Sequence, residues 1–395
     1  MTGWVEKFDA IVLGAGAAGL MCALTAGQRG RRVLLLEQTD KVGAKILISG
    51  GGRCNFTNLE SGPKRFISEN PNFCTSALSR YTQKDFVSFV ERHGIAYHEK
   101  TLGQLFCDGS ARQIVAMLLK DCAQAGVDVR TGQTVSSVTR GDEFRVETGA
   151  GSFRAPSLVL ATGGLSIPKM GATGFSYDVA RQFGLRVTER KPGLVPFKLE
   201  PGTDGFDPAL SGVSLEAIVT LGKRSFREAL LFTHRGLSGP SILQISSYWQ
   251  PGEVIAVDFL PDQDAAVLLI ERKRSRAKSA PQTVLAELIP ARLAQFLAAA
   301  QLPLSEMANI SDRTLATFGE RLKRWEFRPS DTEGYAKAEV TAGGIDTRDL
   351  SSKTMEAQGC PGLFAIGEAV DVTGWLGGYN FQWAWSSGWT AGQAI

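Results

Sequence analysis

Residues 14–19 have the types and spacing of a phosphate-binding turn. The sequence Gly-Ala-Gly-Ala-Ala-Gly follows an apolar run at 10–13 and precedes a helical pattern that extends to about residue 28. Gly14 permits a tight turn, and Gly16 lets the backbone approach a pyrophosphate at the helix N-terminus. Gly19 lets the helix pack closely on the strand. The segment therefore predicts a dinucleotide-binding site.

An acidic residue stands where such a site needs one. Glu37 ends the next apolar run, at 33–36. Its carboxylate can accept hydrogen bonds from ribose hydroxyls, and it would repel a 2′-phosphate. NADP is therefore disfavoured at this site, whereas FAD and NAD both remain candidates.

A second glycine-rich segment, at 45–58, places Gly50, Gly51 and Gly52 ahead of polar side chains. Backbone amides there could face a flat ring, and Arg53 can balance negative charge. Asn55 and Asn58 offer both donors and acceptors to a ring edge. Taken alone, an ordinary glycine loop explains this segment equally well.

A third segment near the C-terminus has a similar order of features. An apolar run at 362–366 precedes Gly367, and a second turn at 377–378 precedes a helical pattern that continues to the end of the chain. The first turn can hold the other half of a long dinucleotide. The helix can direct its N-terminus at the pyrimidine carbonyls of a flavin. Two such half-sites favour FAD over NAD.

The elements that must position these residues form an α/β pattern. Residues 10–36 read as strand, helix and strand, which is a βαβ unit. Further helices are predicted at 83–91 and 112–125, and strands at 127–129 and 135–139. Residues 144–148 and 153–155 flank a glycine turn and predict a hairpin, followed by a buried strand at 158–161. We expect a Rossmann-like FAD-binding domain.

The middle of the chain has a different composition. Residues 192–260 alternate short β-rich runs with turn residues, as in a small barrel or sandwich, whereas the 66 residues between Gly252 and Gly319 contain no glycine and predict helices. We therefore expect a discontinuous FAD-binding domain at 1–190 and 335–395. The inserted domain would span 191–334, with a β-barrel at 191–260 and about 319–334 and a helical subdomain at 261–318.

Charge and cysteine spacing exclude several classes of protein. The chain has 43 basic and 40 acidic residues, a balance that indicates a small-molecule partner rather than a nucleic acid. The six cysteines form no CxxC pair, and no metal-ligand spacing is present, so no metal is expected. Residues 10–28 lack charge, but their glycines argue against a membrane span. Without a basic leader we expect a cytoplasmic protein, and nothing indicates its oligomeric state.

These segments, together with those at 161–164, 233–240 and 337–344, resemble the HI0933-like (BaiN-type) flavoprotein family, often described as NAD(P)/FAD-dependent oxidoreductases. The resemblance covers nearly the whole chain, and its most specific part is the SGGGRCNFTN segment at 49–58. It implies noncovalent FAD in a fold of the two-dinucleotide-binding-domain flavoprotein type, with the β-barrel and helical subdomain inserted. Trp375-Leu376 departs from the smaller residues that many relatives carry before Gly377, which puts the shape of the pocket in question.

The motifs and the resemblance together predict which residues bind FAD. They are Gly14, Ala15, Gly16, Ala17, Ala18, Gly19, Glu37, Gln38, Lys45, Ser49, Gly51, Gly52, Arg53, Cys54, Asn55, Val135, Ala161, Thr162, Gly163, Gly367, Glu368, Asp371, Gly378, Asn380 and Phe381. The catalytic group is not identified, and the candidates are Arg53, His234 and Asn380.

The sequence-based hypothesis is an FAD-dependent oxidoreductase that transfers a hydride between noncovalent FAD and an unidentified small organic substrate or NAD(P)H. The alternative is a flavin-binding protein with an RNA-binding or redox-sensing role. Its local support is the basic cluster at 272–278, which more simply reads as a solvated helix face. Cys54 could be a redox thiol, but without a nearby second cysteine it reads as a packed residue.

Overall fold

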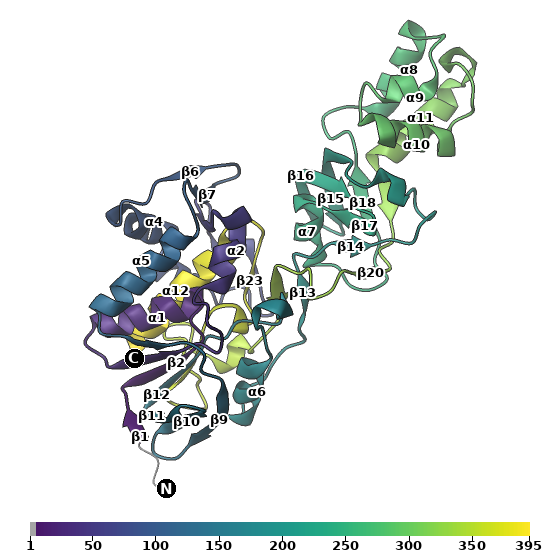
Figure 1. Cartoon of the computed structure of the whole chain (residues 1–395). Helices are drawn as coiled ribbons and strands as arrows, with labels where there is room; N and C mark the ends of the chain where they lie inside the picture. The colour runs from purple at the N-terminus through teal and green to yellow at the C-terminus, as the bar shows by residue number, and fades with distance from the viewer. Residues whose placement is uncertain (1–4) are drawn as a thin grey trace. The chain divides into compact units, whose positions relative to one another are not determined.

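The computed structural model describes residues 5–395, which form two compact units (Figure 1). Unit 1 comprises Met1–Lys191 and Val340–Ile395, and unit 2 comprises Pro192–Glu339. The sequence placed the return to the first domain near residue 335, a few residues before Val340. Within the described range no helix is long and apolar enough to cross a membrane.

The centre of unit 1 is a five-stranded parallel sheet with the strand order β22-β12-β2-β3-β8. Its strands are β2 (Ala10–Leu13), β3 (Val33–Leu36), β8 (Asp128–Arg130), β12 (Ser157–Leu160) and β22 (Leu363–Ala365). All residues of β2 and β3 are buried, which explains their uninterrupted apolar sequence. This arrangement is the Rossmann-like architecture that the sequence predicts, with β22 contributed by the end of the chain.

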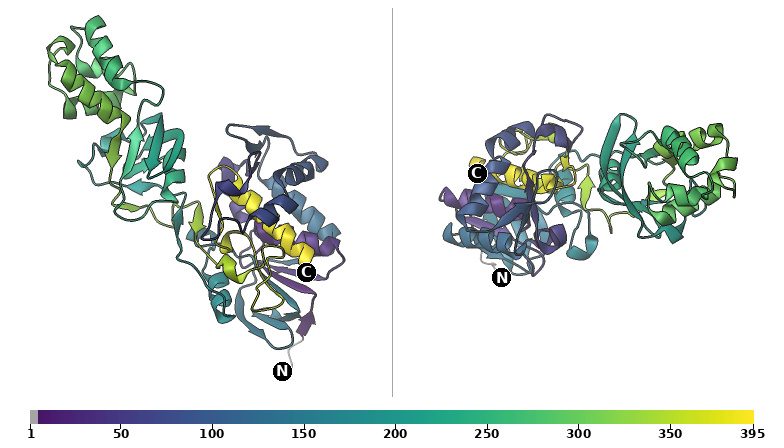
Figure 2. Two further views of the ribbon diagram at one scale, coloured as in Figure 1. Left: turned by 180° about the vertical axis from the view of Figure 1, so that it is seen from behind. Right: turned by 90° about the horizontal axis from the view of Figure 1, so that it is seen from above.

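Three helices pack together in unit 1: α1 (Ala17–Gln28), α5 (Arg112–Gln124) and α12 (Tyr379–Ala394). Figures 1 and 2 show these helices lying side by side. A Cβ atom at Gly388 would lie 2.4 Å from the carbonyl oxygen of Ala18, and one at Gly392 would lie 2.7 Å from that of Cys22. Glycines in α12 therefore allow α1 and α12 to approach closely, and α1 joins the N-terminal and C-terminal parts of the unit.

Smaller elements complete unit 1. A four-stranded sheet contains β1 (Val5–Lys7), β11 (Gly151–Ala155), β10 (Phe144–Thr148) and β9 (Val135–Arg140), in that order. Its β10–β11 pair is the hairpin predicted from the sequence. A second, three-stranded sheet has the order β4 (Asn55–Asn58), β7 (Gln104–Cys107) and β6 (Tyr97–Glu99). The remaining elements are α2 (Ala44–Gly52), β5 (Phe66–Ile67), α3 (Thr75–Arg80), α4 (Gln83–Arg92), α6 (Phe175–Gln182), β21 (Val340–Ala342) and β23 (Thr373–Gly374).

Unit 2 contains a seven-stranded antiparallel sheet with the order β19-β18-β15-β16-β17-β14-β20. The strands are β14 (Phe197–Lys198), β15 (Ser214–Leu221), β16 (Arg224–Phe232), β17 (Gly236–Ser238), β18 (Ile255–Asp258), β19 (Trp325–Phe327) and β20 (Asp331–Thr332), and α7 (Pro240–Ser246) packs on this sheet. Residues 328–330 join the two edge strands, so the sheet must curl. No hydrogen-bonded ladder joins these edges among the described strands, so the β-barrel stays a prediction.

The glycine-free segment of unit 2 forms helices. They are α8 (Ala265–Ser275), α9 (Pro281–Leu285), α10 (Ala291–Gln301) and α11 (Asp312–Lys323), and β13 (Lys191–Gly193) lies at the boundary with unit 1. A Cβ atom at Gly319 in α11 would lie 2.4 Å from the backbone nitrogen of Ala266 in α8. The first glycine after the long glycine-free run therefore stands where these two helices touch.

Candidate functional site

The three glycines of the turn at 14–19 have three different environments. Gly14 has φ +101°, and a Cβ atom there would lie 2.6 Å from the carbonyl oxygen of Ala161. A Cβ atom at Gly19 would lie 1.9 Å from the carbonyl oxygen of Gly14, whereas one at Gly16 would meet no described atom within 4 Å. Gly16 is also the residue that precedes the first turn of α1. The open space at Gly16, next to unpaired helix amides, fits a pyrophosphate.

Glu37 lies beside this turn at the end of β3. Its Oε2 accepts a hydrogen bond from the backbone nitrogen of Ala15 at 3.0 Å, and its Oε1 accepts bonds from the nitrogen and hydroxyl of Thr39 at 2.9 Å. The backbone nitrogen of Gln133 donates to the carbonyl oxygen of Glu37 at 2.8 Å, which brings the segment leading to Val135 close to Glu37. The side-chain amide of Gln38 donates a hydrogen bond to the carbonyl oxygen of Gly171. These contacts place Glu37 and Val135 in one region, which suits an adenosine half-site.

A polar network joins α2 to the C-terminal glycine turn. Lys45 Nζ lies 2.6 Å from both Ser166 Oγ and Glu368 Oε2. Ser166 Oγ donates to Glu368 Oε1 at 2.9 Å, and the nitrogen of Thr341 donates to the same oxygen at 3.0 Å. Glu368 is thus held in place from three segments of the chain. A Cβ atom at Gly163 would lie 4.0 Å from Glu368 Oε2, so the predicted turn at 161–163 also reaches this network.

Gly367 is fixed on both sides. Its backbone nitrogen donates a hydrogen bond to Ser387 Oγ at 3.0 Å, and its carbonyl oxygen accepts one from Trp383 Nε1 at 2.9 Å. A Cβ atom at Gly367 would lie 2.7 Å from the Cβ of Ala18 in α1. The second glycine turn is therefore attached to both α12 and α1. Ser387 and Trp383 were not predicted, because their contacts to Gly367 span 20 and 16 residues and leave no local pattern.

The glycines of α2 interrupt that helix. Gly50, Gly51 and Gly52 have φ values of +57°, +66° and +85°, and Ser49 before them is extended. Such consecutive left-handed residues need glycine. A Cβ atom at Gly51 would meet no described atom within 4 Å, whereas one at Gly50 would lie 2.7 Å from the ring of Phe106. Gly51 therefore presents bare backbone to open space, as the approach of a flat ring requires.

Asn55 supplies an unused acceptor next to this backbone. Its Nδ2 donates to Gln104 Oε1 at 3.3 Å, while its Oδ1 is buried and has no hydrogen-bond partner. A Cβ atom at Gly378, the residue before α12, would lie 2.8 Å from this Oδ1. A buried acceptor beside the donors of a helix N-terminus matches the alternating acceptor–donor–acceptor edge of an isoalloxazine. The residues present thus fit the pyrimidine end of FAD.

Several predicted residues have structural contacts instead. The Asn380 amide bonds to the nitrogen and carbonyl oxygen of Gly374, at 2.8 and 2.9 Å, and therefore holds the loop before α12. Asn58 donates to the carbonyl oxygens of Gly377 and Leu102. Asp371 accepts a bond from the nitrogen of Glu69 at 2.9 Å, and burial raises its pKa. These three side chains shape the surroundings of the site.

Other predicted residues either form contacts within the protein or are exposed to solvent. Ser49 donates to the carbonyl oxygen of Ile46, Thr162 bonds to Ser176, and Phe381 stacks on Trp385 with 5.8 Å between ring centroids. Arg53 is exposed, and His234 is an exposed residue of unit 2.

Cys54 is a buried thiol. It has φ +52° and 0% exposure, and burial raises its pKa to about 12. Cys107, across the β4–β7 pair, is also buried, and its pKa is raised to about 11. Thiols are nucleophilic as thiolates. Both groups are therefore protonated at neutral pH, which supports a packing role for Cys54.

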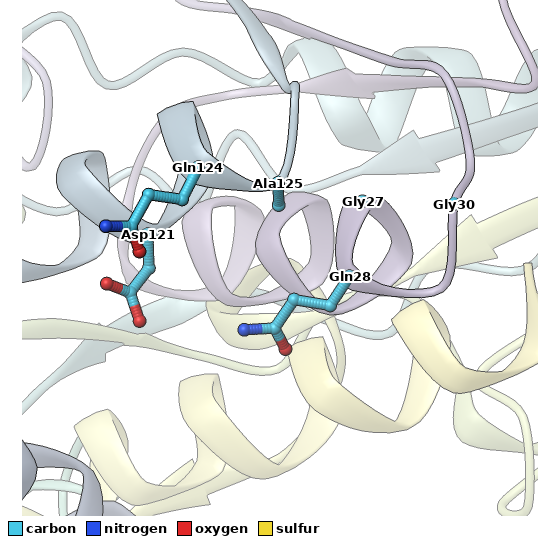
Figure 3. Close-up of a pocket in the computed structure, with 6 residues that line it drawn as sticks. All are labelled: Gly27, Gln28, Gly30, Asp121, Gln124 and Ala125. Atoms are coloured by element: carbon cyan, nitrogen blue, oxygen red, sulfur yellow. The ribbon is translucent and has the colours of Figure 1, made fainter.

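A hollow of about 310 Å³ lies elsewhere in unit 1 (Figure 3). Gly27, Gln28 and Gly30 line it from the end of α1, and Asp121, Gln124 and Ala125 line it from the end of α5. It lies at the C-terminal end of α1, whereas the glycine turn lies at the N-terminal end. The hollow is therefore separate from the site assembled above. No group of three or more His, Cys, Asp or Glu residues able to hold a metal occurs in residues 5–395.

Comparison with known proteins agrees with this geometry. The profile of the HI0933-like protein Rossmann domain matches residues 8–394. A ribosomal RNA dihydrouridine synthase of Escherichia coli (strain K12) is 50% identical over 394 residues, which cover 99% of this chain and 98% of that protein. A 3-dehydro-bile acid delta(4,6)-reductase of Clostridium scindens is 28% identical over 406 residues, with 97% and 98% of the two chains covered.

The fold also matches a solved structure. The 3-ketosteroid-delta4-(5alpha)-dehydrogenase of Rhodococcus jostii RHA1 aligns with a TM-score of 0.51 at 17% identity, over 99% of this chain and 98% of that one. At this identity the match concerns the fold alone.

Proposed function

The chain belongs to the HI0933-like family of FAD-dependent oxidoreductases, and from this premise we propose that it reduces the C5=C6 double bond of a uridine in ribosomal RNA. The observation that carries the proposal is the 50% identity, over almost the full length of both chains, to a ribosomal RNA dihydrouridine synthase. The expectation that no nucleic acid binds is not confirmed, and this proposal replaces it. The reductase named among the relatives supports the direction of the reaction.

The reaction adds two hydrogens to the base. One is needed as a hydride at one ring carbon and the other as a proton at its neighbour, so the base gains two electrons with the hydride. FAD supplies the hydride when it is bound. Everything else is the task of the protein, which must hold the cofactor, exclude water and bring the base to it.

We assign the cofactor-holding roles by half-site. The turn at 14–19 holds the pyrophosphate, Glu37 binds the ribose, and Glu368, fixed by Lys45, faces the ribityl chain. Gly51 and Gly52 lie against the ring, and Asn55 accepts a hydrogen bond from its pyrimidine edge. The support is the open space at Gly16 and Gly51 and the unpaired Oδ1 of Asn55.

The contacts of the three catalytic candidates suggest different roles for them. Arg53 is exposed beside the glycine triplet and stays the candidate for contact with the ring or the substrate. Asn380 is proposed as a positioning residue, because its amide is used by Gly374. His234 stays a candidate from unit 2 without an assigned contact.

The electron source is proposed to bind only transiently. The strands of residues 192–339 form an antiparallel sheet rather than a second parallel βαβ unit. NAD(P)H would then use the substrate pocket and leave it before the base enters. A Kd near 1 μM, the tight end of the usual range of KM values, would argue against this order of events.

The alternative is a flavoprotein that binds RNA or senses redox state without reducing a base. The protonated state of Cys54 and Cys107 disfavours sensing by thiols. The two proposals separate in cells from which this chain has been removed. Ribosomal RNA from those cells should lack a dihydrouridine, detected by nucleoside mass spectrometry, and the wild-type chain should restore it. A Gly16→Val chain, which keeps the surface but binds FAD more weakly, should restore less of it. Restoration to the wild-type level by this variant, when it is purified from the same cells with little FAD bound, would favour the non-catalytic role.

A further inference from the structure

Three cations lie around the glycine triplet of unit 1, and we call Arg53, Lys100 and Arg112 the basic face. Arg53 follows Gly52 directly, and Arg112 follows Ala111, whose nitrogen donates to the carbonyl oxygen of Gly52 at 2.8 Å. Lys100 Nζ lies 5.5 Å from the centroid of the Phe106 ring, on the strand that pairs with Asn55. Figure 1 shows the end of α2 beside β6 and β7 in this part of the unit. The three cations therefore border the backbone assigned to the flavin ring.

The three cations of the basic face are free to bind an anion from solution. All three side chains are exposed, and none of them forms an ion pair with a carboxylate in the part of the chain that the structure describes. Two acidic residues of the same sequence region have other partners. Asp108 pairs with His98 at 2.6 Å, and Glu99 accepts a bond from the nitrogen of Gly103 at 3.1 Å. The positive charge is therefore left to attract an anion from solution.

The basic cluster at 272–278 differs in this respect. Arg272 and Arg276 pair with Glu287 at 3.5 and 2.9 Å, and Lys273 pairs with Asp312 at 2.8 Å. Two carboxylates of unit 2 thus pair with three of the five cations of this cluster. The cluster borders no residue assigned to the cofactor, so it is the weaker candidate for binding the RNA segment that carries the reacting base.

An exposed aromatic ring adjoins the basic face. His98 stacks on Phe106 with 6.2 Å between centroids and an interplanar angle of 17°, and its side chain is 42% exposed. Cations that follow a phosphate backbone, together with a ring on which a base can stack, are the usual features of single-stranded nucleic acid sites. Unpaired bases are also the ones that an enzyme can place against a cofactor.

We propose that the basic face and the ring of His98 bind a single-stranded segment of ribosomal RNA and guide one base of it to the flavin. This rests on the function proposed above. The phosphate backbone of the RNA would run over Lys100 and Arg112, and Arg53 would lie at the point where the RNA segment meets the cofactor site. The interaction is electrostatic, so its strength must fall as the salt concentration rises.

The test uses Lys100 and Arg112, which have no assigned contact with FAD. A Lys100→Gln/Arg112→Gln variant of the FAD-loaded protein is titrated with a fluorescent oligouridylate at several salt concentrations, with anisotropy as the readout. The slope of log K against log salt is negative, and each phosphate contact on a single strand contributes about −0.7 to it, so the slope of the double variant should be less steep by about 1.4. Its FAD content should equal that of the wild type.

The matched control is Arg31→Gln/Lys120→Gln, which removes the same charge from two exposed residues of unit 1 that are not part of the basic face. It should keep the wild-type slope. A wild-type slope in the Lys100/Arg112 variant, or the same loss in the control, overturns the proposal. The proposed function is tested separately, by the dihydrouridine that the wild type forms. If dihydrouridine forms while the double variant keeps the wild-type slope, the proposed RNA binding by the basic face is wrong and the proposed function stands.

Discussion

Replacement of Gly16 by valine separates the cofactor role of the glycine turn from its folding role. Gly16 has φ −81° and ψ −171°, an extended conformation that valine adopts readily. A Cβ atom at this position meets no described atom within 4 Å, so the FAD-free protein should tolerate the side chain. The new methyl groups would fill the space assigned to the pyrophosphate. Gly16→Val should therefore weaken FAD binding while the fold stays intact.

The size of the effect follows from overpacking, which typically costs about 1–3 kcal/mol. A loss of about 2.8 kcal/mol corresponds to a Kd about 100-fold higher. At a free FAD concentration of about 100 times the wild-type Kd, the cofactor stabilises the wild type by about 2.7 kcal/mol, and this falls to about 0.4 kcal/mol in the variant. Flavin-fluorescence titration of the FAD-free proteins measures the Kd, and thermal unfolding with and without FAD measures the stabilisation.

Gly19→Ala is the matched control. Its Cβ atom would lie 1.9 Å from the carbonyl oxygen of Gly14, so α1 has to move away from the turn. This variant should unfold at a lower temperature even without FAD, in contrast to Gly16→Val. Wild-type FAD affinity in Gly16→Val, or a fold as unstable as that of Gly19→Ala, would refute the placement of the pyrophosphate.

Three further predictions concern single side chains. Glu37→Ala should raise the Kd for FAD in the same titration, and an unchanged Kd would remove Glu37 from the ribose site. Asn55→Leu should weaken FAD binding or shift the flavin potential, while the FAD-free fold stays intact. Asn58→Leu should instead destabilise the fold, because Asn58 donates to the carbonyl oxygens of Gly377 and Leu102. Equal behaviour of the two variants would contradict the assignment of Asn55 to the flavin site. Cys54 should resist iodoacetamide at pH 7–8 until the protein unfolds. Because its folded pKa of about 12 exceeds the unfolded value, Cys54 should cost stability as the pH rises from about 9 towards 12, and rapid labelling of the native protein would contradict its burial.

The features that sequence could predict are those built from neighbouring residues. The turn at 14–19 carries its signal within six positions, because strand end, phosphate approach and helix packing each need a glycine at a fixed spacing. The hairpin at 144–155 was equally local, and the long glycine-free run indicated the helices of unit 2. The family was identified from such segments as well, with the specific sequence at 49–58.

The features that sequence could not predict depend on contacts between distant residues. Lys45 and Glu368 are 323 positions apart, and only the folded chain brings them to 2.6 Å. Asn55 and Asn380 are both amides in glycine-rich segments, yet one has an unpaired oxygen and the other holds a loop. The partners of charged residues are a second example. The cluster at 272–278 meets its acidic partners only in three dimensions, whereas the basic face is dispersed over three segments of sequence.

We expect FAD bound by unit 1 to pass its electrons to a uracil in ribosomal RNA. The most direct test of this expectation is a single turnover without oxygen, in which protein carrying reduced FAD is mixed with ribosomal RNA that lacks dihydrouridine. The absorption of oxidised flavin should return, and dihydrouridine should form in equal amount, measured by mass spectrometry of the same samples. Flavin that stays reduced in the presence of this RNA, or that is reoxidised without any dihydrouridine, would contradict it.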